Sequence, residues 1–207
     1  MNSMCMQRRI SASSFRSLLL CPHALFLDHH GDPSLKTELG EFESYLLDEG
    51  KRFEAEVLQG QIYVQPDYPE CDFEAGAQAT LDLMAAGHEL IYQGVLMTDR
   101  FIGIPDLLVK RRGQSTLGGW HYEPREIKTA RSVKEFHVLQ LCLYAMMLEE
   151  VQGRRSKTAT VILADESEVT VDLVEQWSAF EGQLEEAVAI VGRKTMTDFA
   201  LFSGCDE

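Results

Sequence analysis

The sequence predicts an α/β protein in which helices flank a mixed central sheet that contains an antiparallel meander. Apolar residues recur at helical spacing in both outer parts of the chain, whereas residues 88–129 show the period of two that is typical of strands. A long helical segment then separates these strands from two more. With 207 residues, 45% of them hydrophobic, the chain has the size of one domain and can bury a substantial core.

The N-terminal third is predicted to be helical. The stretch from Ser13 to His30 reads as an amphipathic helix broken at Cys21-Pro22, because proline disfavours helical geometry in the residue before it. Residues 31–35 are rich in turn-forming residues and form a predicted loop. A second helix is expected over 42–58, and a third over 74–86 ends before a glycine suited to positive φ.

The middle of the chain is predicted to form consecutive strands. Residues 88–112 read as two strands joined near Thr98-Asp99-Arg100, and another strand spans Trp120–Thr129 after the Gly118-Gly119 turn. Three consecutive strands imply an antiparallel meander.

The next segment is a long helix. Ser132 and Glu135 have the spacing of a capping box, and the helix is expected to end before Gly153. Residues 158–164 and 168–173 read as a fourth strand and its edge partner, and residues 174–191 form a closing helix.

Composition limits the classes of function. The chain carries 33 acidic and 19 basic residues, a formal charge of −14, so a polyanionic partner would need a local basic groove or a metal ion. Three basic clusters are present, each of them also compatible with a solvated loop: Arg8-Arg9, Lys110-Arg111-Arg112, and Arg154-Arg155 with Lys157. No apolar run has the length of a membrane span, and five irregularly spaced cysteines do not describe a disulfide framework. We therefore expect a cytoplasmic protein with no membrane partner.

A carboxylate in an apolar strand is the first candidate for chemistry. Asp106 interrupts the stretch GIPDLLV, where an unpaired charge is costly. Glu126 and Lys128 lie two apart in another expected strand and so share a face. Two carboxylates with a nearby ammonium can hold Mg²⁺ or Mn²⁺ and orient or help deprotonate a water, as in metal-assisted phosphodiester hydrolysis. The alternative is a structural ion-pair network of the same three side chains.

Taken with further motifs, the chain resembles the PD-(D/E)xK nuclease superfamily, in its RecB-like and CRISPR-associated exonuclease branch, and especially a bacterial subgroup of predicted RecB-family nucleases. The resemblance spans nearly the whole chain, from LLLCPHALFLD to LQLCLYAMMLEEVQG. Four ordered elements carry it: Glu54 in GKRFEAEVL, Asp106 in GIPDLLV, Glu126-Ile127-Lys128, and Gln140 with Tyr144 in QLCLY.

The resemblance implies a restriction-endonuclease-like core and a division of the single domain, residues 1–207. An N-terminal helical segment (1–40) precedes the catalytic core (41–173), and a C-terminal helix and tail follow (174–207). It implies roles for the motif residues: Asp106, Glu126, the Ile127 backbone carbonyl and Glu54 at the metal, Lys128 with Asp106 and Glu126 in catalysis, and Gln140 and Tyr144 on the nucleic acid.

Two features depart from the family pattern. Many relatives have a histidine ligand just before the helical glutamate, where this chain has Phe53, and we interpret His121 and His137 as structural residues. Relatives often hold a [4Fe–4S] cluster with one N-terminal and three C-terminal cysteines. Cys21 and Cys205 match only part of that set, so no intact cluster is expected, and the chain resembles a truncated domain of a longer protein.

These observations support three hypotheses. The first is a metal-dependent deoxyribonuclease, an exonuclease or single-strand-acting enzyme of DNA repair, recombination or defence, whose partners are single-stranded DNA or DNA ends and further domains or a larger complex. The second is a catalytically impaired nuclease-fold module that binds nucleic acid or a protein. The third is an α/β domain without chemistry. Metal binding separates the first from the third, and cleavage separates the first from the second.

Overall fold

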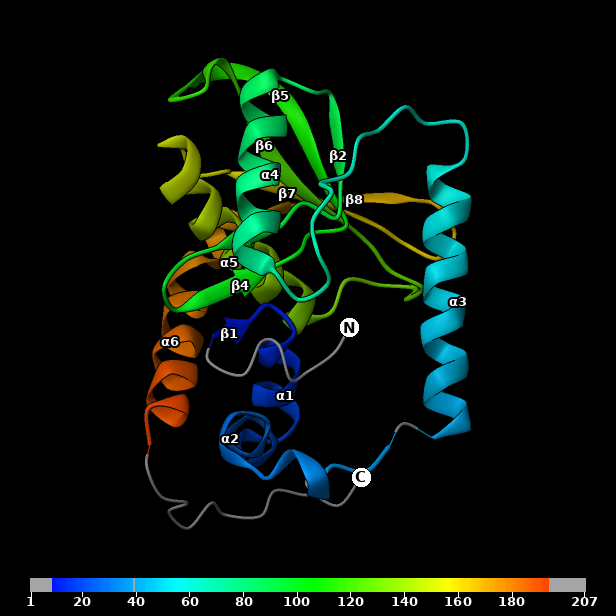
Figure 1. The fold of residues 1–207 in the computed structure, drawn as a ribbon, viewed down its shortest axis with the longest axis vertical. Helices are drawn as coiled ribbons and strands as arrows, with labels where there is room; N and C mark the ends of the chain where they lie inside the picture. The colour runs from blue at the N-terminus through cyan, green and yellow to red at the C-terminus, as the bar shows by residue number, and fades with distance from the viewer. Residues whose placement is uncertain (1–8, 39, 194–207) are drawn as a thin grey trace.

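The computed structural model describes residues 9–38 and 40–193 and shows an α/β architecture with six α-helices and two sheets (Figure 1). The larger sheet has five strands in the order β2-β5-β6-β7-β8. Its strands are β2 (Leu90–Tyr92), β5 (Leu107–Ser115), β6 (Gly118–Ile127), β7 (Thr158–Ile162) and β8 (Glu168–Asp172). β6 and β7 are parallel and every other neighbouring pair is antiparallel, which confirms the mixed sheet.

The expected meander is present as β2, β5 and β6, but it is interrupted. Residues 88–112 form four strands instead of the predicted two, because β3 (Leu96–Met97) and β4 (Phe101–Gly103) leave the large sheet. They pair with each other around the predicted turn and form a three-stranded sheet with β1 (Ile10–Ser11). The chain leaves β2 at Gln93, whose φ is +49°, and Pro105, which has no N–H for a ladder, precedes the return to the large sheet.

The helices agree with the predictions to within about a residue at their N-terminal ends up to α4. Cys21 is extended and separates α1 (Ser14–Leu20) from α2 (Pro22–His30), as the proline predicted. Pro33–Leu35 forms a 3₁₀ turn within the expected loop. The remaining helices are α3 (Glu41–Leu58), α4 (Phe73–Ala86), α5 (Glu135–Gln152) and α6 (Leu173–Val191), and α4 ends at Gly87 with φ of +74°.

The predicted capping box of Ser132 and Glu135 is wrong. α5 begins at Glu135 itself, with Lys134 as the N-cap residue. The backbone N–H of Lys134 donates to Nδ1 of the buried His137 at 3.2 Å. His137, in the first turn of the helix, thus accepts the bond from the N-cap backbone N–H, a role that the capping-box spacing assigned to Glu135.

Each face of the large sheet has its own apolar cluster. Ile91, Leu108, Tyr122 and Val161 join the main core, which α1, α2, α5 and α6 also build. Alternate residues of the same strands, with Leu58 of α3, form a smaller cluster on the other face: Leu107, Ile127 and Ile162. In Figure 1, α3 stands at one side of the molecule, apart from the other helices. No helix in residues 9–38 and 40–193 is long and apolar enough to cross a membrane.

Candidate metal and catalytic site

The start of β5 and the end of β6 bring two carboxylates together. Asp106 immediately precedes β5, and Glu126 is the second-last residue of its antiparallel neighbour β6. The backbone N–H of Asp106 donates to Glu126 Oε1 at 3.2 Å, and the backbone N–H of Ile127 donates to Asp106 Oδ2 at 2.7 Å. These reciprocal bonds tie each acid to the backbone of the opposite strand, so the pair is built into the sheet.

Lys128 joins this pair from the residue just beyond β6. Its Nζ contacts Glu126 Oε2 and lies 3.9 Å from Asp106 Oδ2. The expectation that Glu126 and Lys128 share a face is therefore confirmed, while Ile127 packs into the cluster on the other face. The Glu126 side chain is only 1% exposed, so this is a buried pair and not an ordinary surface ion pair.

The charges of this cluster do not balance. Burial and the neighbouring Glu126 raise the pKa of Asp106 well above its usual range, against the opposing effect of Lys128, and Glu54 adds to the increase. Burial alone would lower the pKa of Lys128, but Glu126 and Asp106 outweigh it and raise that pKa instead. Three carboxylates thus act on one ammonium, which leaves a net negative site suited to an additional cation.

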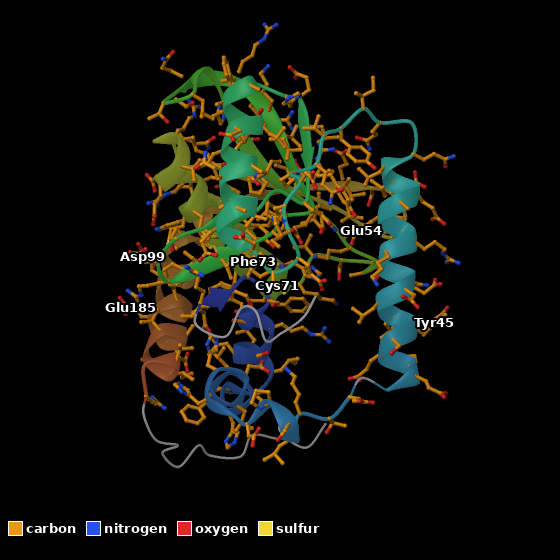
Figure 2. The ribbon with its side chains drawn as sticks, in the orientation of Figure 1. Tyr45, Glu54, Cys71, Phe73, Asp99 and Glu185 are labelled. Carbon is orange, nitrogen blue, oxygen red and sulfur yellow. The ribbon has the colours of Figure 1, made fainter. Side chains whose placement is uncertain are left out.

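Glu54 approaches from α3 and is held by a residue that the sequence did not single out. The Tyr92 hydroxyl donates to Glu54 Oε2 at 3.0 Å. Tyr92 ends β2, one residue before Gln93, whose backbone N–H donates to the Asp106 carbonyl at 3.0 Å. Figure 2 shows Glu54 on the side of α3 that faces the sheet and Tyr45 on the opposite side. Tyr45 and Glu54 are nine positions apart in α3. At 3.6 residues per turn this is two and a half turns, so the two side chains point in opposite directions.

Gln140 and Tyr144 lie four apart on α5 and act together. Gln140 Nε2 donates to the Tyr144 hydroxyl at 3.1 Å, and this hydroxyl lies 3.5 Å from the Ile104 carbonyl. Burial raises the pKa of Tyr144 well above its usual value, and the charges of Glu126 and Asp106 act in the same direction. Tyr144 is therefore a neutral hydroxyl close to the acidic pair, while its ring belongs to the main core.

A second residue outside the predicted set makes room for this tyrosine. A Cβ at Gly103 would lie 2.5 Å from a ring carbon of Tyr144 and 2.7 Å from Met147 Cε. Only glycine permits so close an approach of β4 to α5. The glycine itself is visible in the sequence GIPD, three residues before Asp106. The sequence does not show that this glycine packs against Tyr144.

An open cleft of about 690 Å³ connects these elements. Four of the predicted residues line it: Glu54, Asp106, Gln140 and Tyr144. Glu126 and Lys128 do not line the cleft. They lie behind Asp106, which contacts both of them and does line it. The N-terminal segment contributes the cations Arg9, Arg16 and Lys36 and a group of serines to the other wall. Arg9 pairs with Glu74 at 3.0 Å, and Lys36 pairs with Asp28, which also lines the cleft, at 2.8 Å.

The cluster fits a hard divalent cation by its donors and its charge. Mg²⁺ is held in many proteins by only one or two carboxylates, with water and substrate oxygens completing the octahedron. Asp106 and Glu126 supply such a pair, and burial together with the charge of Glu126 raises the pKa of Asp106. Within residues 9–38 and 40–193, no three His, Cys, Asp or Glu side chains are arranged as a ready metal-binding group. Of the predicted metal ligands, the structure therefore brings Asp106 and Glu126 together, and Glu54 does not complete a group of three with them.

The remaining sequence candidates are placed as follows. Phe53 packs against the cluster of Leu58 and Ile127, so this side chain has an apolar role. His121 and His137 are both buried and do not join the carboxylates. Cys21 is a buried free thiol between α1 and α2, and Cys205 lies outside the described residues.

Comparison with other proteins leaves the family open. No family model matches the chain, and no curated protein matches it.

Proposed function

We propose that this chain is a metal-dependent nuclease with a restriction-endonuclease-like core that hydrolyses DNA phosphodiester bonds in the cytoplasm. The observation that supports it most is the buried contact of Asp106, Glu126 and Lys128 at the meeting point of β5 and β6. An apolar structural role would not require two acids beside one lysine, with Glu126 accepting from the N–H of Asp106 and Asp106 accepting from the N–H of Ile127. The open cleft beside the carboxylate pair, with Arg16 among its lining residues, supports a path for a polyanion.

Each residue has a distinct role in this proposal. Asp106 and Glu126 hold Mg²⁺ or Mn²⁺, with Glu54 contributing from α3 and the Ile127 carbonyl from β6. A cation bound there would supply Lewis-acid polarisation of a phosphoryl oxygen and would increase the acidity of the attacking water. Lys128 orients that water and stabilises negative charge as the phosphate is attacked. Gln140 and Tyr144 position the strand, which favours single-stranded DNA or DNA ends as substrate.

The test is cleavage of end-labelled single- and double-stranded DNA with Mg²⁺, with Mn²⁺ and with chelator. The wild type should cut only with metal, and product length distinguishes exonucleolytic from endonucleolytic action. Asp106→Ala should lose metal binding and cleavage together, which titration calorimetry with Mn²⁺ checks. Binding of Mn²⁺ unchanged by Asp106→Ala would contradict the proposed ligands.

Lys128→Ala separates catalysis from metal binding. Because the lysine is not a ligand, this variant should still bind Mn²⁺ and fold. It should lose most turnover, on the order of a hundredfold or about 3 kcal/mol, since a preorganised charge at the reacting phosphate has that typical effect. Single-turnover rates measure this. Cleavage at the wild-type rate would show that the activity comes from elsewhere.

One observation favours a second candidate, a nuclease-fold module that binds nucleic acid or a protein without cutting. Phe53 occupies the position of the additional ligand and packs among apolar side chains. Metal binding and DNA binding without any cleavage under Mg²⁺ and Mn²⁺ would support this candidate. The same chain would then serve a repair or defence complex as a binding module.

A further inference from the structure

A second pocket lies along the β5–β6 ladder, toward the end away from Asp106 and Glu126. It has a volume of about 320 Å³. Its lining consists of seven residues: Arg111, Arg112, His121, Glu123, Arg154, Arg155 and Lys157. Arg111 is paired with His121 in the β5–β6 ladder, five residues from Asp106. At ~3.3 Å per strand residue, this corresponds to about 17 Å from the carboxylate pair.

The pocket is strongly cationic although the protein is acidic. Five of its seven residues are Arg or Lys, and Glu123 is the only acid among them. Two of the cations are already engaged: Arg111 pairs with Glu123 at 3.3 Å, and Arg155 pairs with Glu149 and stacks over Trp177. Within residues 9–38 and 40–193, the exposed side chains of Arg112 and Lys157 make no ion pair or hydrogen bond. They leave positive charge uncompensated at the pocket.

The interior of the pocket contains a polar atom without a partner. His121 is 4% exposed, and its Nδ1 is buried without a hydrogen bond to any described residue. The other ring nitrogen lies 3.6 Å from Glu123 Oε1, beyond hydrogen-bonding distance. Buried polar atoms in folded proteins normally have a partner, which a ligand can supply.

The backbone around this atom is built to keep space open. β5 has a bulge between Arg112 and Ser115, and Gly113 within it has φ of +147°. A Cβ at Gly113 would lie 2.9 Å from Arg154 Nη1 and 3.0 Å from His121 Nδ1. Arg154 itself is held by a bond from Nη1 to the Gln114 carbonyl at 3.1 Å. The glycine thus allows a guanidinium and an imidazole nitrogen to lie next to each other.

We propose that this pocket binds one phosphate group, as inorganic phosphate or the phosphomonoester of a small molecule. The planar guanidinium groups of Arg112 and Arg154 suit phosphate oxygens, and Lys157 adds a point charge. A phosphate that carries one proton also offers an O–H to His121 Nδ1, and a phosphate oxygen serves the ring when that nitrogen is protonated. The volume is at the lower end of that of small-ligand pockets. This site is independent of the carboxylate pair.

The proposal is tested by calorimetric titration of inorganic phosphate into the full chain at constant ionic strength, with chloride as the replaced anion. Saturable binding is expected, together with a shift of the His121 ring nitrogens in NMR spectra. Arg112→Gln with Lys157→Gln should weaken binding at least tenfold, and both side chains are exposed, so the fold is kept. Absence of saturable binding, or binding that leaves His121 unchanged, would overturn the proposal.

A matched control separates a built site from general charge. Lys51→Gln with Arg52→Gln removes the same two positive charges from exposed positions on α3. This variant and Asp106→Ala should bind phosphate as the wild type does. Equal weakening in both charge variants would overturn the site. Competition by an oligonucleotide without a terminal phosphate would assign the pocket to backbone diesters and overturn the small-ligand assignment.

Discussion

α3 and α5 have the same length and both contribute to the candidate site, but they are anchored very differently. Each has 18 residues. In α5, ten residues are buried, including Tyr144, whereas in α3 only Leu58 is. The first half of α3 exposes large apolar side chains: Phe42, Tyr45, Leu46 and Leu47. Residues from α5 are therefore fixed by the core, and Glu54 is positioned by the C-terminal end of α3 and one hydrogen bond.

This difference suggests how the site is assembled. Asp106, Glu126, Lys128 and Tyr144 are held by the sheet and the main core, so their arrangement does not depend on α3. Glu54 belongs to the less packed element, and local stability follows the number of buried apolar contacts. We therefore expect α3 to adjust its position when metal or nucleic acid occupies the cleft.

The largest test of this comparison is truncation of one leucine in each helix. Leu143→Ala in α5 removes a fully buried side chain and should lower the free energy of unfolding by about 2–5 kcal/mol. Leu47→Ala in α3, where the side chain is 53% exposed, should change it by less than about 0.5 kcal/mol. Denaturant unfolding measures both. Similar losses would show that α3 is packed as firmly as α5.

The comparison of α3 and α5 also shows how much of the fold the sequence could predict. Both helices were expected from their apolar spacing, and α3 begins one residue before the predicted start. What spacing could not show is which helix is covered: Tyr45 and Leu46 satisfy the same pattern as core residues, yet they face outward. Burial depends on the tertiary position of a helix, which lies beyond a local pattern.

The sequence predicted the residues of the candidate site that form local patterns and missed those whose role depends on tertiary contacts. Asp106, Glu126 and Lys128 were recognised because an acid in an apolar strand and an E-x-K triplet are visible in the chain. Tyr92 and Gly103 were missed, since their importance arises from contacts with Glu54 and Tyr144 that lie 38 and 41 positions away. The departure of β3 and β4 from the large sheet was also missed. Four short strands in sequence show the same alternation of apolar and polar residues as two long strands.

A pair of glycine substitutions should give effects of opposite sign. Gly103→Ala places a methyl group 2.5 Å from the Tyr144 ring, and such overpacking should cost about 1–3 kcal/mol and reduce cleavage by displacing the tyrosine. Gly50→Ala in α3 meets no atom within 4 Å and should stabilise the protein by about 0.5–1 kcal/mol. Thermal unfolding of the two variants checks the signs. Destabilisation by Gly50→Ala would mean that α3 is more crowded than its exposure indicates.

Acid provides another way to probe the start of α5. Burial, with Lys128 and Lys134 nearby, lowers the pKa of His137 to about 4 from an ordinary value of 6.5. Between these two values the unfolded chain binds more protons than the folded one, so the free energy of unfolding should decrease as pH falls through this window. We expect a loss of about 2–3 kcal/mol between pH 7 and pH 4.5, since one pH unit corresponds to about 1.4 kcal/mol and this range extends about two units below the ordinary pKa.

Denaturant unfolding at pH 7 and pH 4.5 measures this loss. His137→Gln should flatten the dependence, because the amide does not titrate, while Leu47→Ala should keep the wild-type slope. An unchanged slope in His137→Gln would assign the acid sensitivity to other groups.

The smallest expected effect tests the single bond between Glu54 and the sheet. Tyr92→Phe removes the hydroxyl that donates to Glu54 Oε2 at 3.0 Å and keeps the ring in its apolar cluster. The loss of one hydrogen bond to a partly exposed carboxylate should cost only about 0.5–1.5 kcal/mol. Because α3 has little other anchoring, the same change should weaken Mn²⁺ binding a few-fold when Glu54 contributes to the metal.

Tyr63→Phe is the matched control for that substitution. The Tyr63 ring packs edge-on against Tyr92 with centroids 5.4 Å apart, so its hydroxyl can be removed beside the same cluster without breaking the bond to Glu54. Unfolding and Mn²⁺ titration should both remain close to wild type for Tyr63→Phe. If Tyr92→Phe binds Mn²⁺ as tightly as this control, then either Glu54 is not a metal ligand or its position does not depend on the bond from Tyr92.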